Sequence, residues 1–387
     1  MPGALSVSAL AILVVAQLVH TQACRPTRTE TPAPSPSPAP TPAPQSEVFV
    51  TRDGVRFQVE VVATGLEIPW SMVYAPDGRV FLTERPGRVR IYDLSRRTSS
   101  VALTLADVGA RNEAGLLGLA LDPDFTQNRR VYIYYSAEVS GGGIVNRIVR
   151  YREVNGVLGE RAVLLDNIPA AGIHDGGRLR FGPDRLLYAT AGDAADTGFP
   201  LDLATYAGKI LRITTDGATP PTNPYSSPIY TYGHRNPQGL DWHPVTGDLW
   251  ATEHGNVGND ELNIIQRGGN YGWPRSEGGL VQAGTIGPVT FFNPSIAPSG
   301  ASFYRGSRFP QFANDLFVAT LRGSHLMRVK LDSSGRGIDF SERLLDGRFG
   351  RLRDVVIGPD GYIYFCTNDV RAGGSPDDRI IRIVPAS

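Results

Sequence analysis

The sequence predicts an all-β fold, a six-bladed β-propeller, on the basis of three observations. A loosely similar unit occurs six times along most of the chain. Within each unit, apolar residues alternate with polar ones, as half-buried strands require. The 387 residues include 44 glycines and 30 prolines and few long amphipathic stretches, which favours many strands joined by turns over helices.

Each unit contains a turn with Pro-Asp or Asp-Gly, an alternating strand and a second strand rich in Arg and Ile. The six units are YAPDGRVFLTERPGRVRIYD, LDPDFTQNRRVYIYYS with NRIVRYR, FGPDRLLYATAGD with GKILRI, WHPVTGDLWATEHG with DELNII, ANDLFVATLRGSHLMRVKL, and IGPDGYIYFCTN with DRIIRIV. Units of roughly 40 to 75 residues with about four strands are typical of propeller blades. Two packed β-sandwiches are the alternative, and six similar units in one run fit it less well.

The strand predicted at Phe57–Leu66 has no partner in its own unit. We expect it to pair with the last unit and close the ring, which removes an exposed sheet edge.

The N-terminus indicates export. An apolar run, Ala9–Val19, is short for a membrane span and ends in small and polar residues, as in a signal peptide of residues 1–24. Residues 25–46 form a Pro/Ala/Ser/Thr-rich linker, and residues 47–387 form the propeller. We expect a periplasmic or extracellular protein, with lipidation of Cys24 and simple cleavage as the two alternatives.

The overall charge excludes one class of partner. Lys and Arg number 38 and so do Asp and Glu, without the basic surplus expected of a nucleic-acid-binding protein. Cys366 is the only cysteine of the folded part, so no disulfide is expected within it.

Polar loops from different units suggest a single site at one end of the channel. His174, in IHDGGRLRFGPD, could accept a proton from a hydroxyl group, and Asp193, in the following AGD turn, could orient the imidazole. The alternative is a histidine that caps a turn.

Cations and amides in other loops could bind an anion. Arg235, Asn236 and Gln238 lie in GHRNPQGLDWHP, where a structural role in a turn is the alternative. Arg351 and Arg353 share one face if GRLRDVV is a strand, and two like charges there favour an anionic ligand.

Oxygen-bearing residues in EHGNVGNDELN could bind calcium. Asp260 and Glu261 lie here beside a glycine-rich backbone, and calcium prefers carboxylate and carbonyl oxygens. A solvated acidic turn is the alternative.

Taken together, the motifs NEAGLLGLALDPDF, HDGGRLRFGPD, GHRNPQGLDWHP, ATEHG, DELNII, GGNYGWP, APSGASFYRG and GRLRDVVIGPDG resemble, in this order, the soluble PQQ-dependent glucose and aldose sugar dehydrogenases. The resemblance runs from about residue 47 to the end. It implies a six-bladed propeller that holds pyrroloquinoline quinone (PQQ) and calcium at the channel mouth and oxidises aldoses at C1 to lactones.

The resemblance also implies residue roles. His174 would be the general base, with Asp193 as its carboxylate partner, and hydride would pass from the sugar to the quinone. The residues implied in cofactor binding are Glu113, Arg235, Asn236, Gln238, Arg322, Arg351 and Arg353. The backbone carbonyls of Gly255 and Asn256 would bind the catalytic calcium. Glu261 and the backbone of Tyr271, with Asp260 nearby, resemble a second, structural calcium site.

The chain departs from the family pattern at three places. Asn256 replaces a proline, Arg322 replaces a lysine, and Thr290 and Asn293 stand where aromatic residues shape the sugar pocket in the glucose enzyme. We therefore expect a more open site and broad aldose specificity.

The absence of a C-x-x-C-H motif predicts an external electron acceptor, such as a soluble quinone, a dye or a cytochrome. Three alternatives stay open at this point: a PQQ enzyme for a non-sugar alcohol, a calcium-dependent lactonase-like hydrolase, and a non-catalytic propeller that binds sugar or protein.

Overall fold

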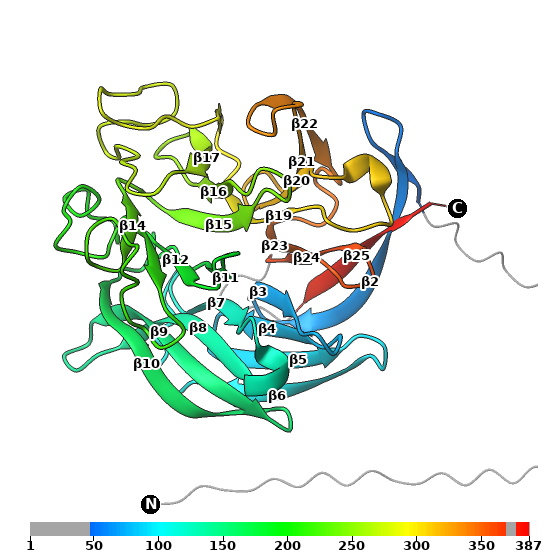
Figure 1. Cartoon of the computed structure of the whole chain (residues 1–387). Coiled ribbons are helices and arrows are strands. Elements are labelled where there is room, and N and C mark those ends of the chain that lie inside the picture. Colours follow the sequence, from blue (N-terminus) through cyan, green and yellow to red (C-terminus); the bar gives the residue numbers. More distant parts are fainter. Residues whose placement is uncertain (1–46, 369–376, 387) are drawn as a thin grey trace, which may run out of the picture. The chain divides into compact units, whose positions relative to one another are not determined.

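Six antiparallel sheets surround a central channel and form the predicted propeller (Figure 1). The computed structural model describes residues 47–368 and 377–386. The predicted signal segment 1–24, with Cys24, and the linker 25–46 lie outside the described residues. Within the described ranges, no helix has the length and apolar character needed to span a bilayer.

The first three blades have four strands each. Blade 1 comprises β3 (Pro69–Tyr74), β4 (Val80–Glu84), β5 (Arg88–Asp93) and β6 (Thr98–Thr104). Blade 2 comprises β7 (Leu116–Leu121), β8 (Arg130–Glu138), β9 (Ile144–Val154) and β10 (Val157–Pro169), with the short helix α1 (Phe125–Asn128) between its first two strands. Blade 3 comprises β11 (Leu179–Phe181), β12 (Leu187–Ala191), β13 (Lys209–Ile213) and β14 (Ile229–Tyr232).

The remaining blades complete the ring. Blade 4 comprises β15 (Pro237–Trp242), β16 (Leu249–Glu253), β17 (Asp260–Ile265) and β18 (Thr290–Phe292). Blade 5 comprises β19 (Pro298–Phe303), β20 (Leu316–Thr320), β21 (Leu326–Leu331) and β22 (Ile338–Leu344), with the 3-10 turn η1 (Pro310–Phe312). Blade 6 comprises β23 (Leu352–Ile357), β24 (Ile363–Thr367), β25 (Asp378–Pro385), β2 (Arg56–Leu66) and β1 (Phe49–Val50).

The repeated Pro-Asp turns have a common hydrogen bond that explains the aspartate. The Asp77 carboxylate accepts the backbone N–H of residue 79 at 3.1 Å, and Asp360 accepts that of residue 362 at 3.2 Å. Such a side-chain bond two residues ahead reverses the chain between the first and second strands of a blade.

Threonines on the second strands join neighbouring blades. The Thr83 hydroxyl donates to the carbonyl of Leu117 at 2.6 Å, and the Thr252 hydroxyl donates to the carbonyl of Ser299 at 2.7 Å. Each bond connects one blade to the first strand of the next. The first strands lie beside one another and line the channel.

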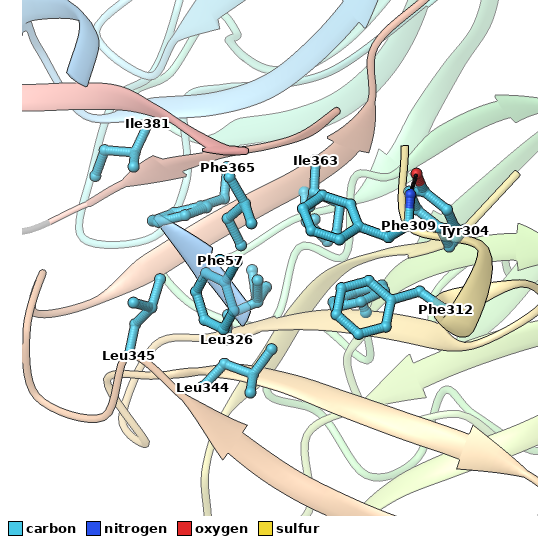
Figure 2. Close-up of a cluster of buried hydrophobic side chains, with 14 of the residues drawn as sticks. Phe57, Tyr304, Phe309, Phe312, Leu326, Leu344, Leu345, Ile363, Phe365 and Ile381 are labelled. Carbon is cyan, nitrogen blue, oxygen red and sulfur yellow. Dashed lines mark hydrogen bonds between the residues drawn. The ribbon is translucent and has the colours of Figure 1, made fainter. Parts of the chain in front are cut away.

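The ring closes as the sequence predicted. Strand β2 pairs with β25 in a register that runs from Phe57 opposite Pro385 to Leu66 opposite Asp378. Phe57 also enters a buried cluster between blades 5 and 6, with Phe312, Leu326 and Phe365 (Figure 2). The N-terminal strand is therefore an integral part of the last blade.

The strand order places two sets of loops at one end of the channel, which we call the site face. The loop from the last strand of a blade to the first strand of the next lies here, and so does the loop from the second strand to the third. The Pro-Asp turns lie at the other end, the opposite face.

Candidate active site

The predicted residues lie at the site face, in several blades and the connections between them. His174 lies between β10 and β11, Asp193 between β12 and β13, and Arg235 and Asn236 between β14 and β15. The remaining predicted residues lie in the segments of blades 1 to 6 that reach this face: Glu113, Gln238, Gly255, Asn256, Asp260, Glu261, Tyr271, Arg322, Arg351 and Arg353.

His174 and Asp193 form a direct pair. The Nδ1 atom of His174 lies 2.8 Å from Oδ1 of Asp193. A carboxylate acceptor requires the proton on Nδ1, so Nε2 of the neutral ring is left with its lone pair. The His174 side chain is 16% exposed and that of Asp193 only 2%, so the imidazole alone is open to a substrate.

Asp193 is itself fixed from three sides. Its Oδ1 accepts the backbone N–H of Ala195 at 2.8 Å, and its Oδ2 accepts the indole N–H of Trp273 at 2.9 Å. Its own backbone N–H donates to the carbonyl of Arg235 at 2.7 Å. The carboxylate that orients His174 therefore has little freedom to rotate.

The loop of His174 packs so closely that one neighbour must be glycine. A Cβ atom on Gly192 would lie 1.9 Å from the His174 carbonyl oxygen, which no side chain can tolerate. Asn236 holds the same loop through its Oδ1, which accepts the backbone N–H of Gly176 at 3.1 Å. Glu113 accepts the backbone N–H of His174 at 3.3 Å.

Asp175 anchors the loop of His174 through hydrogen bonds. Its Oδ1 accepts the Asn146 side-chain amide at 2.9 Å and the backbone N–H of Ala171 at 3.1 Å, while its Oδ2 is buried without a partner in the described part of the chain. Burial raises the pKa of Asp175 to about 7. A protonated Asp175 would place its hydrogen on that unpartnered oxygen.

Arginines gather on the other side of the mouth. Arg353 is buried, and it donates to Oε1 of Gln238 at 2.7 Å and to Oδ1 of Asn368 at 3.2 Å. Burial and then the nearby Arg351 lower the pKa of Arg353 to about 9. Burial, and then Arg351, also lower the pKa of Arg85.

The arginine cluster fits an anionic ligand. Arg351 lowers the pKa values of both Arg85 and Arg353, and Glu113 acts in the opposite direction. The Nε atom of Arg353 and the Nδ2 atom of Asn368 are buried and have no hydrogen-bond partner among the described residues. Unsatisfied donors beside several positive charges are the chemistry that carboxylates would complete.

Arg235, which lies just before the first strand of blade 4, adds further hydrogen-bond donors to the site. Its guanidinium lies 5.3 Å from the centroid of the Trp273 ring, and its Nη1 donates to the carbonyl of His254 at 3.3 Å. Its Nε is buried, and no described residue provides a hydrogen-bond partner for it. The neighbouring Asn236 lies 3.5 Å, Nδ2 to Nδ1, from His254, whose Nε2 lies 3.0 Å from the carbonyl of Pro298.

The predicted calcium loop is shaped by Asp260. One of its oxygens accepts the backbone N–H of Gly255 at 2.9 Å, and the other accepts the backbone N–H groups of Ile296 and Ala297 at 2.6 and 2.7 Å. The second oxygen also accepts the Ser295 hydroxyl. Both oxygens are thus engaged in fixing the loop, and a ligand role for Asp260 stays a prediction.

Gly255 and Asn256 lie on this loop with their N–H groups already bonded, Gly255 to Asp260 and Asn256 to Glu277. Their carbonyls are the oxygens that the prediction assigns to calcium. Arg322 is exposed on the adjacent loop, whose flanking residues Leu321 and Gly323 donate to the carbonyls of Ala297 and Ile296.

Glu261 lies in a second, nearly closed region. It lines a cavity of about 10 Å³ together with Glu253, Glu277 and Tyr271. Burial, with a contribution from Glu253, raises the pKa of Glu261 to about 7. A divalent cation would offset this repulsion, so the carboxylates fit the predicted structural calcium.

Tyr271 lines the same cavity. Its ring stacks on His234 at 4.6 Å, and its hydroxyl donates to the carbonyl of Ile264 at 2.7 Å. Within the described residues, no group of three or more His, Cys, Asp or Glu side chains has an arrangement that could hold a metal. The predicted metal sites rely on backbone carbonyls as well.

The floor of the site is a buried cluster that the sequence did not reveal. Arg178 lies 4.4 Å from the Trp70 ring centroid, and Arg353 lies 5.6 Å from it. Arg178 pairs with Asp354 at 3.1 Å and donates to the carbonyl of Gln238 at 2.8 Å. Trp70, Arg178 and Asp354 of this cluster are all buried.

Sequence reasoning missed four residues of the site: Arg85, Trp273, Asn368 and Arg178. Arg85 and Asn368 directly follow the second strands of blades 1 and 6, in TERPG and FCTND. Asp193 follows a second strand in the same way, one glycine further on, so comparison of equivalent positions between units could have found them. Trp273 lies in the long loop between β17 and β18, which has no equivalent in the other units.

Comparison with known proteins agrees with this geometry. Residues 66–375 match the family described as Glucose / Sorbosone dehydrogenase. The aldose sugar dehydrogenase YliI of Escherichia coli is 34% identical over 336 residues, which cover 80% of this chain and 90% of that protein. The quinoprotein glucose dehydrogenase B of Acinetobacter calcoaceticus is 28% identical over 85% of this chain and 89% of its own.

A solved structure of similar sequence contains a cofactor. The PQQ-bound form of the aldose sugar dehydrogenase from Streptomyces coelicolor is 34% identical, covers 89% of this chain and 99% of its own, and superposes with a TM-score of 0.77. The apo-form of the soluble aldose sugar dehydrogenase from Escherichia coli is 31% identical and covers 85% and 100% of the two chains, also with a TM-score of 0.77.

Proposed function

This chain belongs to the glucose/sorbosone dehydrogenase family, and from that premise we propose that it is a PQQ- and calcium-dependent aldose sugar dehydrogenase that oxidises C1 of aldoses to lactones. The observation that carries the proposal is the His174–Asp193 pair, which shares the channel mouth with a cluster of arginines and buried donors. A base and an anion-binding site in one mouth suit a sugar and an anionic cofactor.

The chain's residues divide the task of cofactor binding. Arg85, Arg235, Arg351 and Arg353 would bind the carboxylates, and the carbonyls of Gly255 and Asn256 would bind calcium. When bound, PQQ supplies the electron-accepting quinone and calcium supplies a Lewis acid. Gln238 and Asn368 orient Arg353, and Trp273 orients Arg235.

His174 acts as the base. Its Nε2 takes the proton of the sugar's anomeric hydroxyl, and Asp193 stabilises the imidazolium that forms. The aldose loses two electrons and two protons overall, so an external acceptor must remove the electrons for turnover.

The substrate pocket and the cell compartment complete the proposal. Asn293 lies beside the calcium loop, where its amide donates to Asn259 at 3.4 Å, and Thr290 begins β18. These small polar residues support broad aldose specificity. The N-terminal apolar run and linker support export, with Cys24 as a candidate lipid anchor.

The test is dye-linked oxidation of several aldoses by residues 47–387, with PQQ and calcium added separately and together. We expect activity only with both, towards several aldoses. Lactone hydrolysis without PQQ would favour the calcium-dependent hydrolase. Calcium-dependent sugar binding without turnover would favour the non-catalytic propeller.

A further inference from the structure

A large cavity opens at the opposite face of the channel, away from the predicted site. Its volume is about 820 Å³, within the range of small-molecule sites. It is lined by the far ends of first strands from five blades and by the Pro-Asp turns that follow two of them, with Val73, Arg180, Asp241, Arg305 and Ile357 among its residues.

The buried cluster of Trp70, Arg178 and Asp354, which forms the floor of the candidate active site, lies between this cavity and the arginine cluster. Along β23, Asp354 belongs to the floor and Val356 lines the cavity. On blade 3, Arg178 belongs to the floor, and Arg180, two residues further and on the same side of the strand, lines the cavity. A ligand in this cavity therefore contacts hydrogen-bond donors other than those of the candidate active site.

The two carboxylates that line the cavity already have polar partners. Asp241 accepts both terminal nitrogens of Arg305, at 2.7 and 3.1 Å. Asp360 accepts the Tyr364 hydroxyl at 2.6 Å and lies 3.8 Å from Arg382. The three lining arginines, Arg180, Arg305 and Arg308, outnumber these two lining carboxylates.

Two arginines of the cavity have no carboxylate partner. The Nε atom of Arg180 is buried and has no hydrogen-bond partner among the described residues, and Arg178 repels its charge. Arg308 is exposed at the rim, and its Nε donates only to the backbone carbonyl of Asp360, at 3.1 Å. The cavity thus carries net positive charge and an unsatisfied donor.

We propose that this cavity binds a small organic anion with a carboxylate or phosphate group. Arg180 and Arg308 bind the charged group, and Val73, Val356 and Ile357 contact the apolar part of the molecule. The proposal rests on the cavity itself and does not depend on the dehydrogenase activity.

Calorimetric titration with succinate and with glycerol 3-phosphate tests the site, with the neutral succinamide as a control. Each titration is carried out with the chain alone and with the chain loaded with PQQ and calcium. An anion that binds to the arginines of the candidate active site should be displaced by PQQ, whereas an anion in the cavity should not. We expect one site for at least one anion, unaffected by PQQ.

Arg180→Gln should weaken this binding about tenfold or more, the effect of losing one charge-assisted hydrogen bond. Arg185→Gln is the matched control, because Arg185 lies on the same face outside the cavity and pairs with Asp124. If Arg180→Gln does not fold, the exposed Arg308→Gln gives the same test.

Three results would overturn the proposal: equal affinity in the wild type and the cavity variants, loss of binding when PQQ is added, or no saturable binding of either anion up to about 10 mM. Weaker binding in Arg180→Gln but not in Arg185→Gln identifies the cavity whether or not the chain binds PQQ, so failure of the proposed enzyme function is distinguished from failure of this site.

Discussion

At the scale of single residues, the proposed chemistry depends on how Asp193 orients His174. The carboxylate accepts the Nδ1–H of His174, the indole N–H of Trp273 and a backbone N–H, and these bonds leave Nε2 as the imidazole nitrogen available to the proposed substrate. The pair could be predicted from the sequence because both residues lie in short motifs. Trp273 could not, because it reaches Asp193 from a segment 80 residues further along the chain.

Asp193→Asn should lower kcat by about 10²- to 10⁴-fold, because an amide no longer fixes the tautomer or stabilises the imidazolium. PQQ affinity should stay within about twofold, since Asp193 does not belong to the arginine cluster. Steady-state kinetics and fluorescence titration measure the two quantities. A variant with unchanged kcat would exclude the assigned role.

The raised pKa of Asp175 predicts that the stability of the fold depends on pH. Because its pKa is raised to about 7, the folded state keeps a proton that the unfolded state releases near pH 4. Stability is therefore lost as the pH rises from about 4 to about 7, by about 4 kcal/mol at most, and levels off above.

Asp175→Asn should remove this slope, because an amide keeps the acceptor for Asn146 and does not ionise. Urea unfolding at pH 5 and pH 8 measures the free energy of unfolding of both proteins. Relative to the wild type, the variant should be more stable at pH 8 than at pH 5. Parallel pH profiles would show that Asp175 is already ionised in the fold.

At the scale of elements, the loops of the site face are held by close backbone approach. The strands and Pro-Asp turns could be predicted, because each unit carries its own alternation and its own aspartate hydrogen bond. The loop conformations could not, because their partners lie far away in the sequence, as when Asp260 bonds residues 295–297.

Gly192→Ala should displace the His174 loop, because the added Cβ would overlap the His174 carbonyl. We expect at least about tenfold lower kcat, since small misplacement of a catalytic group is costly, in a protein that still folds as a propeller. Gly159→Ala is the control, because nothing lies within 4 Å of its Cβ position. Circular dichroism and kinetics check both variants, and equal activity would contradict the packing argument.

At the scale of the whole molecule, the propeller is one closed ring. Six similar units and an unpaired first strand were enough to predict the blades and the closure, because pairing of β2 with β25 removes the exposed edges. The sequence was not enough to predict the cavity at the opposite face, since its lining comes from the ends of strands in five blades.

Removal of residues 1–46 should leave the thermal transition of the propeller unchanged, whereas removal of residues 1–66 should abolish cooperative unfolding. The longer deletion takes away β2 and the buried Phe57, and so exposes both the edge of β25 and the cluster between blades 5 and 6. Differential scanning calorimetry compares the two deletions, and a cooperative transition in the shorter protein would show that closure is dispensable.

The central claim is that this channel mouth oxidises an aldose with His174 as the base, and single-turnover reduction tests it most directly. The chain loaded with PQQ and calcium is mixed with glucose without an electron acceptor, and the absorbance of the cofactor is followed for the wild type and for His174→Gln. The account predicts rapid reduction in the wild type and reduction at least about 10²-fold slower in the variant, with equal PQQ binding. Equal rates in both proteins, or no PQQ binding by the wild type, would contradict it.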